Sequence, residues 1–257
     1  MTCAAMRLAA PIGPIMDAPR AGARQLTQAL FGETIDVLAG QGAWRQVRLR
    51  RDGYEGFMRA SLLVEDDGRA ATHTPCLPQT LIFPAPDIKA APARPLYMGA
   101  QVRIRQWTGR FARLAGGGHV PRHHLRRLDE PQHGPVEIAR MFLHAPYLWG
   151  GCSSAGIDCS GLVQMALRMA GHETVPRDSG DQARTLGAPL PVSLARGGRL
   201  RAGDLIFWTG HVAMMVDETR IIHANAHHMR VAIEPLKEAL GRIEAGGGGP
   251  VTAIRRI

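Results

Sequence analysis

The feature that most constrains the fold of this chain is a segment, residues 159–170, that is apolar almost all round. Leu, Val, Met and Ala residues occupy most positions from 162 to 170, and Gly171 follows the segment. A helix that is apolar almost all round is expected inside a core, and a glycine is a common helix stop. The sequence therefore predicts a buried helix that ends near Gly171, around which a domain must be built.

The predicted helix begins at Cys159, directly after two turns that contain glycine. A helix start carries a partial positive charge and unpaired N–H groups, which favour a thiolate and could hold an oxyanion. These properties are typical of a nucleophilic cysteine. The alternative is a cysteine that acts only as a small core residue, and a partner base decides between the two.

Two histidines are candidates for that base. His211 follows Thr-Gly and starts an apolar strand, while His223 ends the next strand, with a predicted hairpin turn between them. If the two strands pair around this turn so that the numbers of opposite residues sum to 434, the two histidines lie opposite each other. One could then act as base and the other could orient it. Each of the 11 histidines alone is better explained as exposed or hydrogen-bonded, but the joint placement favours catalysis.

Length and composition limit the classes of protein to consider. The 257 residues can hold one large domain or two to three small ones. No apolar run reaches 18 residues and residues 1–20 lack a signal-peptide pattern, so we expect no membrane insertion and a cytoplasmic location. The cysteines have no metal-ligand spacing and need no disulfide framework, so we expect a reducing compartment and no metal; they are Cys3, Cys76, Cys152 and Cys159.

The charge suggests an anionic partner or substrate, since the net charge is +9 and the isoelectric point is about 10.4. The basic residues are dispersed, apart from small groups at 48–51 and 122–127, and no nucleic-acid reader motif accompanies them. We therefore expect no nucleic acid as partner.

The pattern of elements changes along the chain. Alternating segments at 33–38, 44–49 and 54–58, with an Asp-Gly hairpin signal at 52–53, predict a small β-barrel in residues 1–70. A proline- and alanine-rich passage at 75–95 precedes a weaker copy of this order, which predicts a second barrel in residues 71–130. Residues 131–257 predict an α+β domain, with a helix at 136–144 and antiparallel strands at 204–208, 211–217, 220–224 and 230–235.

Several short motifs occur together in residues 131–257. They are Tyr-Leu-Trp-Gly-Gly at 147–151, Asp-Cys-Ser-Gly-Leu-Val-Gln at 158–164, Pro-Arg at 176–177 with Gln182, Gly-Asp-Leu-Ile-Phe-Trp at 203–208, His-Val-Ala at 211–213 and Ile-His-Ala at 222–224. In this order and spacing the region resembles the NlpC-type cell-wall cysteine peptidases. Residues 44–47 and 52–57 resemble bacterial SH3-type domains, and the match is weaker over residues 75–128.

The resemblance implies a papain-like catalytic domain preceded by two SH3-like barrels. It assigns Cys159 as nucleophile, His211 as general base and acid, and His223 as the residue that orients His211. Members of the family cleave peptidoglycan stem peptides, commonly at the bond between γ-D-glutamate and an L-diamino acid, so the expected partner is an anionic wall-derived peptide. No cofactor is implied.

The resemblance also implies a set of substrate-binding residues. Asp158 would pair with the free amino group of an N-terminal L-alanine, and Tyr147 would support that end or the oxyanion. Arg177 and Ser179 fall where the family recognises carboxylates, which suits a bidentate arginine, although Arg177 could equally be a solvated loop cation. The complete expected set is Tyr147, Trp149, Asp158, Ser160, Arg177 and Ser179. Cys152 departs from the family pattern, and we expect it to be a packed residue rather than a second reactive thiol.

The sequence is also compatible with other functions. The same Cys-His-His site could serve a cell-wall amidase or an acyltransferase, and an idle catalytic domain would leave a protein that only binds wall fragments. A free-amine requirement favours soluble turnover peptides and hence wall-peptide recycling, whereas a longer native N-terminus with a signal sequence would favour the periplasm. The barrels could narrow the active-site cleft rather than bind wall independently, because the segment 75–95 is expected to be rigid.

Overall fold

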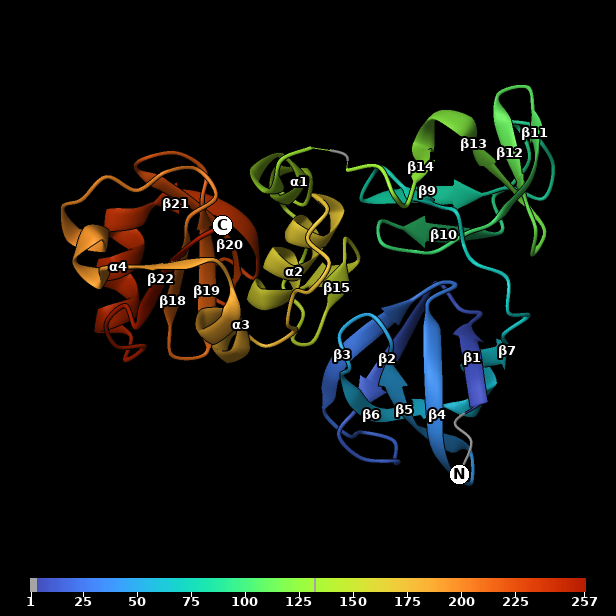
Figure 1. Ribbon diagram of the computed structural model, residues 1–257, viewed down its shortest axis with the longest axis horizontal. Coiled ribbons are helices and arrows are strands. Elements are labelled where there is room, and N and C mark those ends of the chain that lie inside the picture. Colours follow the sequence, from blue (N-terminus) through green and yellow to red (C-terminus); the bar gives the residue numbers. More distant parts are fainter. Residues whose placement is uncertain (1–3, 132) are drawn as a thin grey trace. The chain divides into compact units, whose positions relative to one another are not determined.

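The computed structural model describes residues 4–131 and 133–257, so Cys3 lies outside the described residues. The described residues form two compact units. The first holds residues 4–131 together with 152–154, and the second holds residues 133–151 and 155–257. Figure 1 shows the elements of each unit.

The N-terminal sheet is a seven-stranded antiparallel structure in the order β3-β2-β6-β5-β4-β1-β7. Val47 and Leu49 of β5 are buried on the inner face while Arg48 between them is exposed, as the alternation predicts. Gly53 adopts a φ of 73° in the turn between β5 and β6, which confirms the Asp-Gly hairpin. The elements are β1 Ala4–Leu8, β2 Ile12–Met16, β3 Gln25–Leu30, β4 Thr34–Gln41, β5 Trp44–Leu49, β6 Glu55–Arg59, the short 3-10 helix Ala60–Leu62 and β7 Leu63–Glu65.

The second β-region follows in the same unit and contains three small antiparallel sheets around its own core. The passage at 75–95 lies within this region and contributes β9, along which Thr80 and Ile82 are buried and alternate with more exposed residues. The prolines obscured this alternation in the sequence. The elements are β8 His73–Pro75, β9 Gln79–Ile82, β10 Arg94–Tyr97, β11 Ile104–Thr108, β12 Phe111–Leu114, β13 His119–Pro121, the 3-10 helix Arg122–His124 and β14 Leu125–Arg127.

The second unit has the expected α+β architecture. Its antiparallel sheet has the order β17-β22-β18-β19-β20-β21, with α2 packed against β19 and β20 and α4 beside β21 (Figure 1). The four predicted strands are confirmed within two residues, whereas β17 and β22 were not predicted. The elements are α1 Pro135–Met141, β15 Cys152–Ser153, β16 Gly156–Ile157, α2 Cys159–Met169, α3 Ser179–Thr185, β17 Ala188–Leu190, the 3-10 helix Val192–Arg196, β18 Leu205–Trp208, β19 His211–Met215, β20 Arg220–Asn225, β21 Arg230–Pro235, α4 Leu236–Ala245 and β22 Ala253–Arg256, of which β15 groups with the first unit.

Helix α2 is the predicted buried helix. Every residue from 159 to 167 is buried, and the chain turns at Gly171 with a φ of 97°. Asp158 caps the helix by accepting a hydrogen bond from the Gly161 N–H at 2.7 Å. A side chain at Gly161 would meet the Gly151 carbonyl oxygen at 2.4 Å, so the preceding turn packs directly on the helix start. These contacts fix where Cys159 lies.

The hairpin of β19 and β20 differs by two in register from the prediction. Met214 lies opposite Ile222, so paired residue numbers sum to 436 rather than 434. The Asp217 carboxylate accepts N–H bonds from Thr219 and Arg220, which centres the turn one residue later than expected. Continuing this register places His223 opposite Ala213, so the two histidines are diagonal neighbours on one face, still within reach of each other.

Within residues 4–131 and 133–257, no helix combines the length and the apolar character needed to cross a bilayer.

Candidate active site

Cys159 is the first residue of α2, and its side chain is almost fully enclosed, with 6% of the residue exposed. The thiol interacts with the backbone N–H groups of Ser160 and of Val212, which is the residue after His211. Burial, and then the neighbouring Asp158 carboxylate, raise the pKa of the Cys159 thiol from 9.0 to about 11. The helix start was expected to favour a thiolate, but burial outweighs it, so the free protein holds a neutral thiol.

His211 begins β19, with its Nε2 2.8 Å from Nδ1 of His223. Burial lowers the pKa of His211 to about 3, and the His223 and Arg242 charges act in the same direction. His211 is therefore a neutral imidazole that can accept a proton. Within the described chain no hydrogen bond joins it to Cys159, and such bonds commonly tighten only when substrate binds.

His223 is buried on β20, and its Nε2 lies 2.6 Å from Oε1 of Glu234 on β21. Burial opposes ionisation of Glu234, but the hydrogen bond from His223 and the charge of Arg242 hold the carboxyl pKa below its usual range. A carboxylate only accepts hydrogen bonds, so His223 donates from Nε2 and accepts at Nδ1. His211 then donates from Nε2, which leaves its Nδ1 free to take a proton.

Glu234 was missed in the sequence analysis, although the signal was present. The segment 230–235 was predicted as a strand, and Glu234 is the acidic residue in that otherwise largely apolar segment. In β20–β21 pairing His223 lies opposite Ala232, so Glu234 is the diagonal neighbour of His223. Arg242 of α4 pairs with the same carboxylate from the other side. The site therefore extends across the three strands β19, β20 and β21 and the two helices α2 and α4.

Asp158, Ser160 and Arg177 form a buried polar cluster beside the nucleophile. Arg177 is 3% exposed and donates to the Asp158 carboxylate at 2.7 Å and to the Ser160 hydroxyl at 2.8 Å. The Asp158 carboxylate also accepts from the Gly150 and Gly161 N–H groups. The alternative of a solvated loop cation at Arg177 is therefore wrong. Direct contact of Arg177 with a substrate carboxylate would require it to leave Asp158, so that role stays a prediction.

A cavity of about 220 Å³ opens beside the histidines and is lined in part by Tyr147, Trp208, His211, His223 and Asn225. Burial, and then the nearby Cys159 and Asp158, raise the pKa of the Tyr147 hydroxyl to about 12. Tyr147 is therefore a neutral hydrogen-bond donor between the nucleophile and this cavity.

Two predicted binding residues lie outside the buried network. Trp149 is 56% exposed, and Ser179 is half-buried at the start of α3, where its side chain makes no hydrogen bond to another described residue. The structure thus gathers Tyr147, Asp158, Cys159, Ser160 and Arg177 near one another.

Cys152 belongs to the first unit and is 2% exposed. Its Sγ lies 3.5 Å from the Thr27 hydroxyl of β3, and its backbone N–H donates to the Gln28 side chain at 3.0 Å. This confirms the expected packed residue at the position that departs from the family pattern.

Comparison with known proteins identifies two sequence families in the chain. The NlpC/P60 family matches residues 144–242, which contain the thiol and both histidines. The bacterial dipeptidyl-peptidase Sh3 domain matches residues 15–63, within the N-terminal sheet.

Named relatives and one solved structure are similar to this chain over different shares of its length. A Bacillus subtilis protein named gamma-D-glutamyl-L-lysine dipeptidyl-peptidase is 28% identical over 83% of this chain and 77% of its own length. Dipeptidyl-peptidase 6 of Lysinibacillus sphaericus is 37% identical over 40% of this chain and 36% of its own length. The crystal structure of an NlpC/P60 family protein from Bacillus cereus superposes with a TM-score of 0.80 at 21% identity, covering 98% of this chain and 99% of the other. The fold is therefore that of NlpC/P60 proteins with upstream SH3-like domains.

Proposed function

Since residues 144–242 form an NlpC/P60 domain and residues 15–63 a bacterial SH3 domain, we propose that this chain is a cysteine dipeptidyl-peptidase of peptidoglycan stem peptides. The bond cleaved joins γ-D-glutamate to an L-diamino acid, in peptides with a free N-terminal L-alanine. The relatives named gamma-D-glutamyl-L-lysine dipeptidyl-peptidase support this choice of bond. The observation that carries the proposal is the hydrogen-bonded relay from His211 through His223 to Glu234 beside a buried thiol.

The proposed mechanism starts from the neutral Cys159 thiol and the neutral His211 imidazole. His211 takes the thiol proton at Nδ1 as Cys159 Sγ attacks the γ-glutamyl carbonyl carbon, and the backbone N–H groups at the start of α2 hold the oxyanion. His211 then gives this proton to the leaving amine, which frees the diamino-acid peptide and leaves a thioester. Water, deprotonated by His211, attacks the thioester and releases the dipeptide and the thiol. His223 and Glu234 stabilise the imidazolium that forms twice in this cycle.

Substrate recognition is proposed for the six residues named from the family resemblance. Asp158 and Tyr147 bind the free amino end, and Ser160 and Trp149 line the adjacent surface. Ser179 contacts a carboxylate, while Arg177 supports binding through its ion pair with Asp158.

A kinetic experiment tests the reaction. Purified protein is given L-Ala-γ-D-Glu-L-Lys and the diaminopimelate analogue, and the products are identified by mass spectrometry. Wild type should release L-Ala-D-Glu, and the Cys159→Ala variant should not. Equal turnover by both, or no turnover by wild type, contradicts the proposal.

Product masses also separate the alternatives that use the same thiol. An amidase would release an intact stem peptide from the sugar, and an acyltransferase would add the mass of an acceptor amine. A protein that only binds wall fragments would leave Cys159 unlabelled by a thioester-forming substrate analogue.

We further propose a role in wall-peptide recycling in the cytoplasm, because a free N-terminal alanine exists only on peptides already released from the glycan. Fractionation of cells that express the chromosomally tagged protein tests this, and recovery from the periplasm or medium contradicts it. We also propose the three-part division of the chain at 1–70, 71–130 and 131–257. Limited proteolysis that cuts elsewhere than near 70 and 130 would argue against this division.

A further inference from the structure

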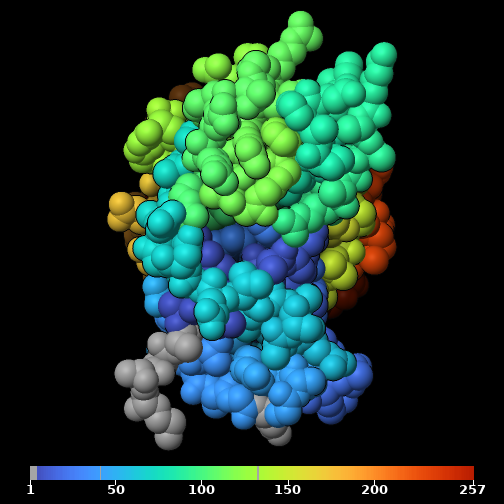
Figure 2. Space-filling model, turned by 90° about the vertical axis from the view of Figure 1, so that its right-hand side faces the viewer, coloured from blue at the N-terminus to red at the C-terminus, as the bar shows by residue number. Residues whose placement is uncertain are grey.

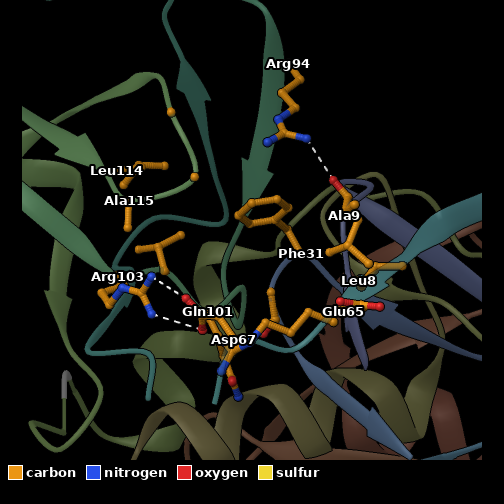
Figure 3. Close-up of a pocket in the computed structure, with 16 residues that line it drawn as sticks. Leu8, Ala9, Phe31, Glu65, Asp67, Arg94, Gln101, Arg103, Leu114 and Ala115 are labelled. Carbon is orange, nitrogen blue, oxygen red and sulfur yellow. Dashed lines mark hydrogen bonds and ion pairs between the residues drawn. The ribbon is translucent and has the colours of Figure 1, made fainter. Parts of the chain in front are cut away.

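The first unit contains a second cavity, of about 370 Å³, between the N-terminal sheet and the second β-region. Figure 2 shows this unit from the side, with dark blue residues of the first strands visible in the recess below the green second β-region. Apolar residues line part of the cavity, among them Leu8, Phe31 and Leu114, which Figure 3 labels. Val64 and Val102 also line it. Its volume is in the range of small-ligand pockets.

The walls of this cavity are joined by short backbone contacts. The Gln101 N–H donates to the Phe31 carbonyl at 2.8 Å. Gly32 has a φ of 76°, and a side chain there would meet the Gln101 carbonyl oxygen at 1.9 Å. The cavity is therefore preformed, which lowers the entropic cost of binding a ligand.

Arg94 lies at one side of Phe31 (Figure 3), with its guanidinium carbon 4.5 Å from the ring centroid. One nitrogen donates to the Ala9 carbonyl at 2.8 Å. Among the described residues no carboxylate pairs with this guanidinium, so further N–H groups remain for an anion. A guanidinium held in this way is suited to a carboxylate.

Some of the other charged side chains that line the cavity already have an ion-pair partner, and one does not. Arg103 is paired with Asp67 at 2.6 Å, and Arg7 is paired with Asp66 at 2.7 Å. Glu65 is exposed on β7, and its carboxylate has no ion pair or hydrogen bond within the described part of the chain. One unpaired cation, Arg94, and one unpaired anion, Glu65, therefore remain on opposite sides of Phe31 (Figure 3).

We propose that this cavity binds a short zwitterionic peptide, with its carboxylate on Arg94, its ammonium group on Glu65 and its aliphatic part over Phe31. The site is separate from the catalytic cavity, since no lining residue is shared. Only the choice of probe, L-Ala-D-Glu, rests on the proposed function, because that reaction releases this dipeptide.

Peptide binding to the cavity is measured in the full-length Cys159→Ala variant, because this variant lacks the nucleophile. Methyl NMR follows Leu8, Val64 and Leu114 during titration with L-Ala-D-Glu, its N-acetyl form and its diamide. The dipeptide should shift these methyl signals, and either modification should weaken binding at least tenfold, which is about 1.4 kcal/mol.

Two substitutions test which residue binds the ammonium end of the ligand and which binds its carboxylate end. Glu65→Gln should bind the free and N-acetylated dipeptides equally, while still discriminating against the diamide. Arg94→Gln should bind the free dipeptide and its diamide equally, while still discriminating against the N-acetyl form. The matched control is Arg59→Gln, because Arg59 also stacks on a ring, that of Trp44 at 4.4 Å, but lies outside the cavity.

The proposal is overturned if the cavity methyl signals do not move at about 10 mM dipeptide, tenfold above a weak millimolar dissociation constant. It is also overturned if Glu65→Gln keeps the full discrimination against the N-acetyl form. Glu65→Gln decides even if Arg94→Gln disturbs folding, since the Glu65 carboxylate forms no ion pair or hydrogen bond with any described residue. Turnover by wild type is measured separately, so a failure of the proposed reaction is distinguished from a failure of this site.

Discussion

At the scale of single residues, burial controls the chemistry of the site. The thiol has a pKa near 11 and His211 one near 3, so the ion pair that attacks must form during the reaction rather than before it. Closure of the site around the substrate can shift these two pKa values toward each other, because excluding water strengthens every interaction inside the site. The free protein is thus protected from alkylation and oxidation, which require thiolate.

This protonation state predicts slow alkylation of Cys159 in the free protein. Its rate constant with iodoacetamide should keep rising up to pH about 11, because burial disfavours the thiolate that reacts. Mass spectrometry of the peptide that contains Cys159 measures the rate. The same peptide in urea-unfolded protein is the control and should level off near pH 9, and a plateau at or below pH 9 in the folded protein would contradict the assignment.

Glu234 is predicted to be a positioning residue. In Glu234→Gln, an amide can either donate to or accept from His223, so His223 is no longer held in one tautomer. We expect kcat to fall by about 10²-fold with KM changed less than about twofold, because loss of an outer partner that orients a functional histidine typically costs about 10–100-fold. Steady-state kinetics on the tripeptide substrate measures both constants.

A pH profile separates this role from a purely structural one. The Glu234 charge raises the pKa of His211, so its removal should shift the acid limb of kcat/KM to lower pH. Glu238→Gln, on the exposed face of α4, is the matched control and should leave the profile unchanged. An unshifted profile in Glu234→Gln would refute the positioning role.

At the scale of elements, the start of α2 combines a helix cap with a buried ion pair. Asp158→Ala removes the cap and leaves the Arg177 guanidinium buried without its partner. Breaking such a pair is expected to cost about 3–5 kcal/mol. Urea unfolding followed by circular dichroism measures the loss. The double variant Asp158→Ala, Arg177→Met should recover part of it, since no charge is then stranded, and a double variant no more stable than the single one would contradict this account.

Elements with a strong local pattern could be predicted from the sequence, and elements defined by distant partners could not. The almost continuously apolar segment identified α2, and mostly apolar runs joined by short turns identified β18 to β21. Strand β22 is short, and β17 contains a proline, so their place in the sheet depends on pairing between residues about 65 apart, such as Pro189 with Arg255. Local patterns do not contain that information.

The same distinction applies to the site. Cys159 and the two histidines could be predicted because they lie within readable motifs, and Cys159 and His211 also begin their elements. The ion pair of Arg177 with Asp158 and the contact of Glu234 with His223 are set by tertiary packing, which no spacing rule describes. The hairpin register was wrong by two because the Asp217 side chain, not the strand pattern, sets the turn.

At the scale of the whole molecule, the second unit should lose stability in mild acid. His211 and His223 are buried and neutral in the second unit, with pKa values lowered from 6.5. Below pH 6.5 the unfolded chain binds protons that the folded site excludes, so the free energy of unfolding falls as pH decreases. The loss is roughly 1 kcal/mol per pH unit for each such histidine and, for His211, continues toward pH about 3. Carboxylates with lowered pKa values, such as Glu234, lose their contribution only below about 4.5, so pH 4.5–6.5 isolates the histidines.

Hydrogen exchange of the α2 amides between pH 4.5 and 6.5, corrected for the intrinsic rate, measures this loss in the second unit alone. In the first unit His73 and His124 also have lowered pKa values, so a global unfolding curve would mix the two units. The control is His211→Gln, which has no imidazole to protonate in the unfolded chain and should show a shallower dependence. An equal slope in both proteins would mean that the relay histidines do not set the acid limit of the catalytic unit.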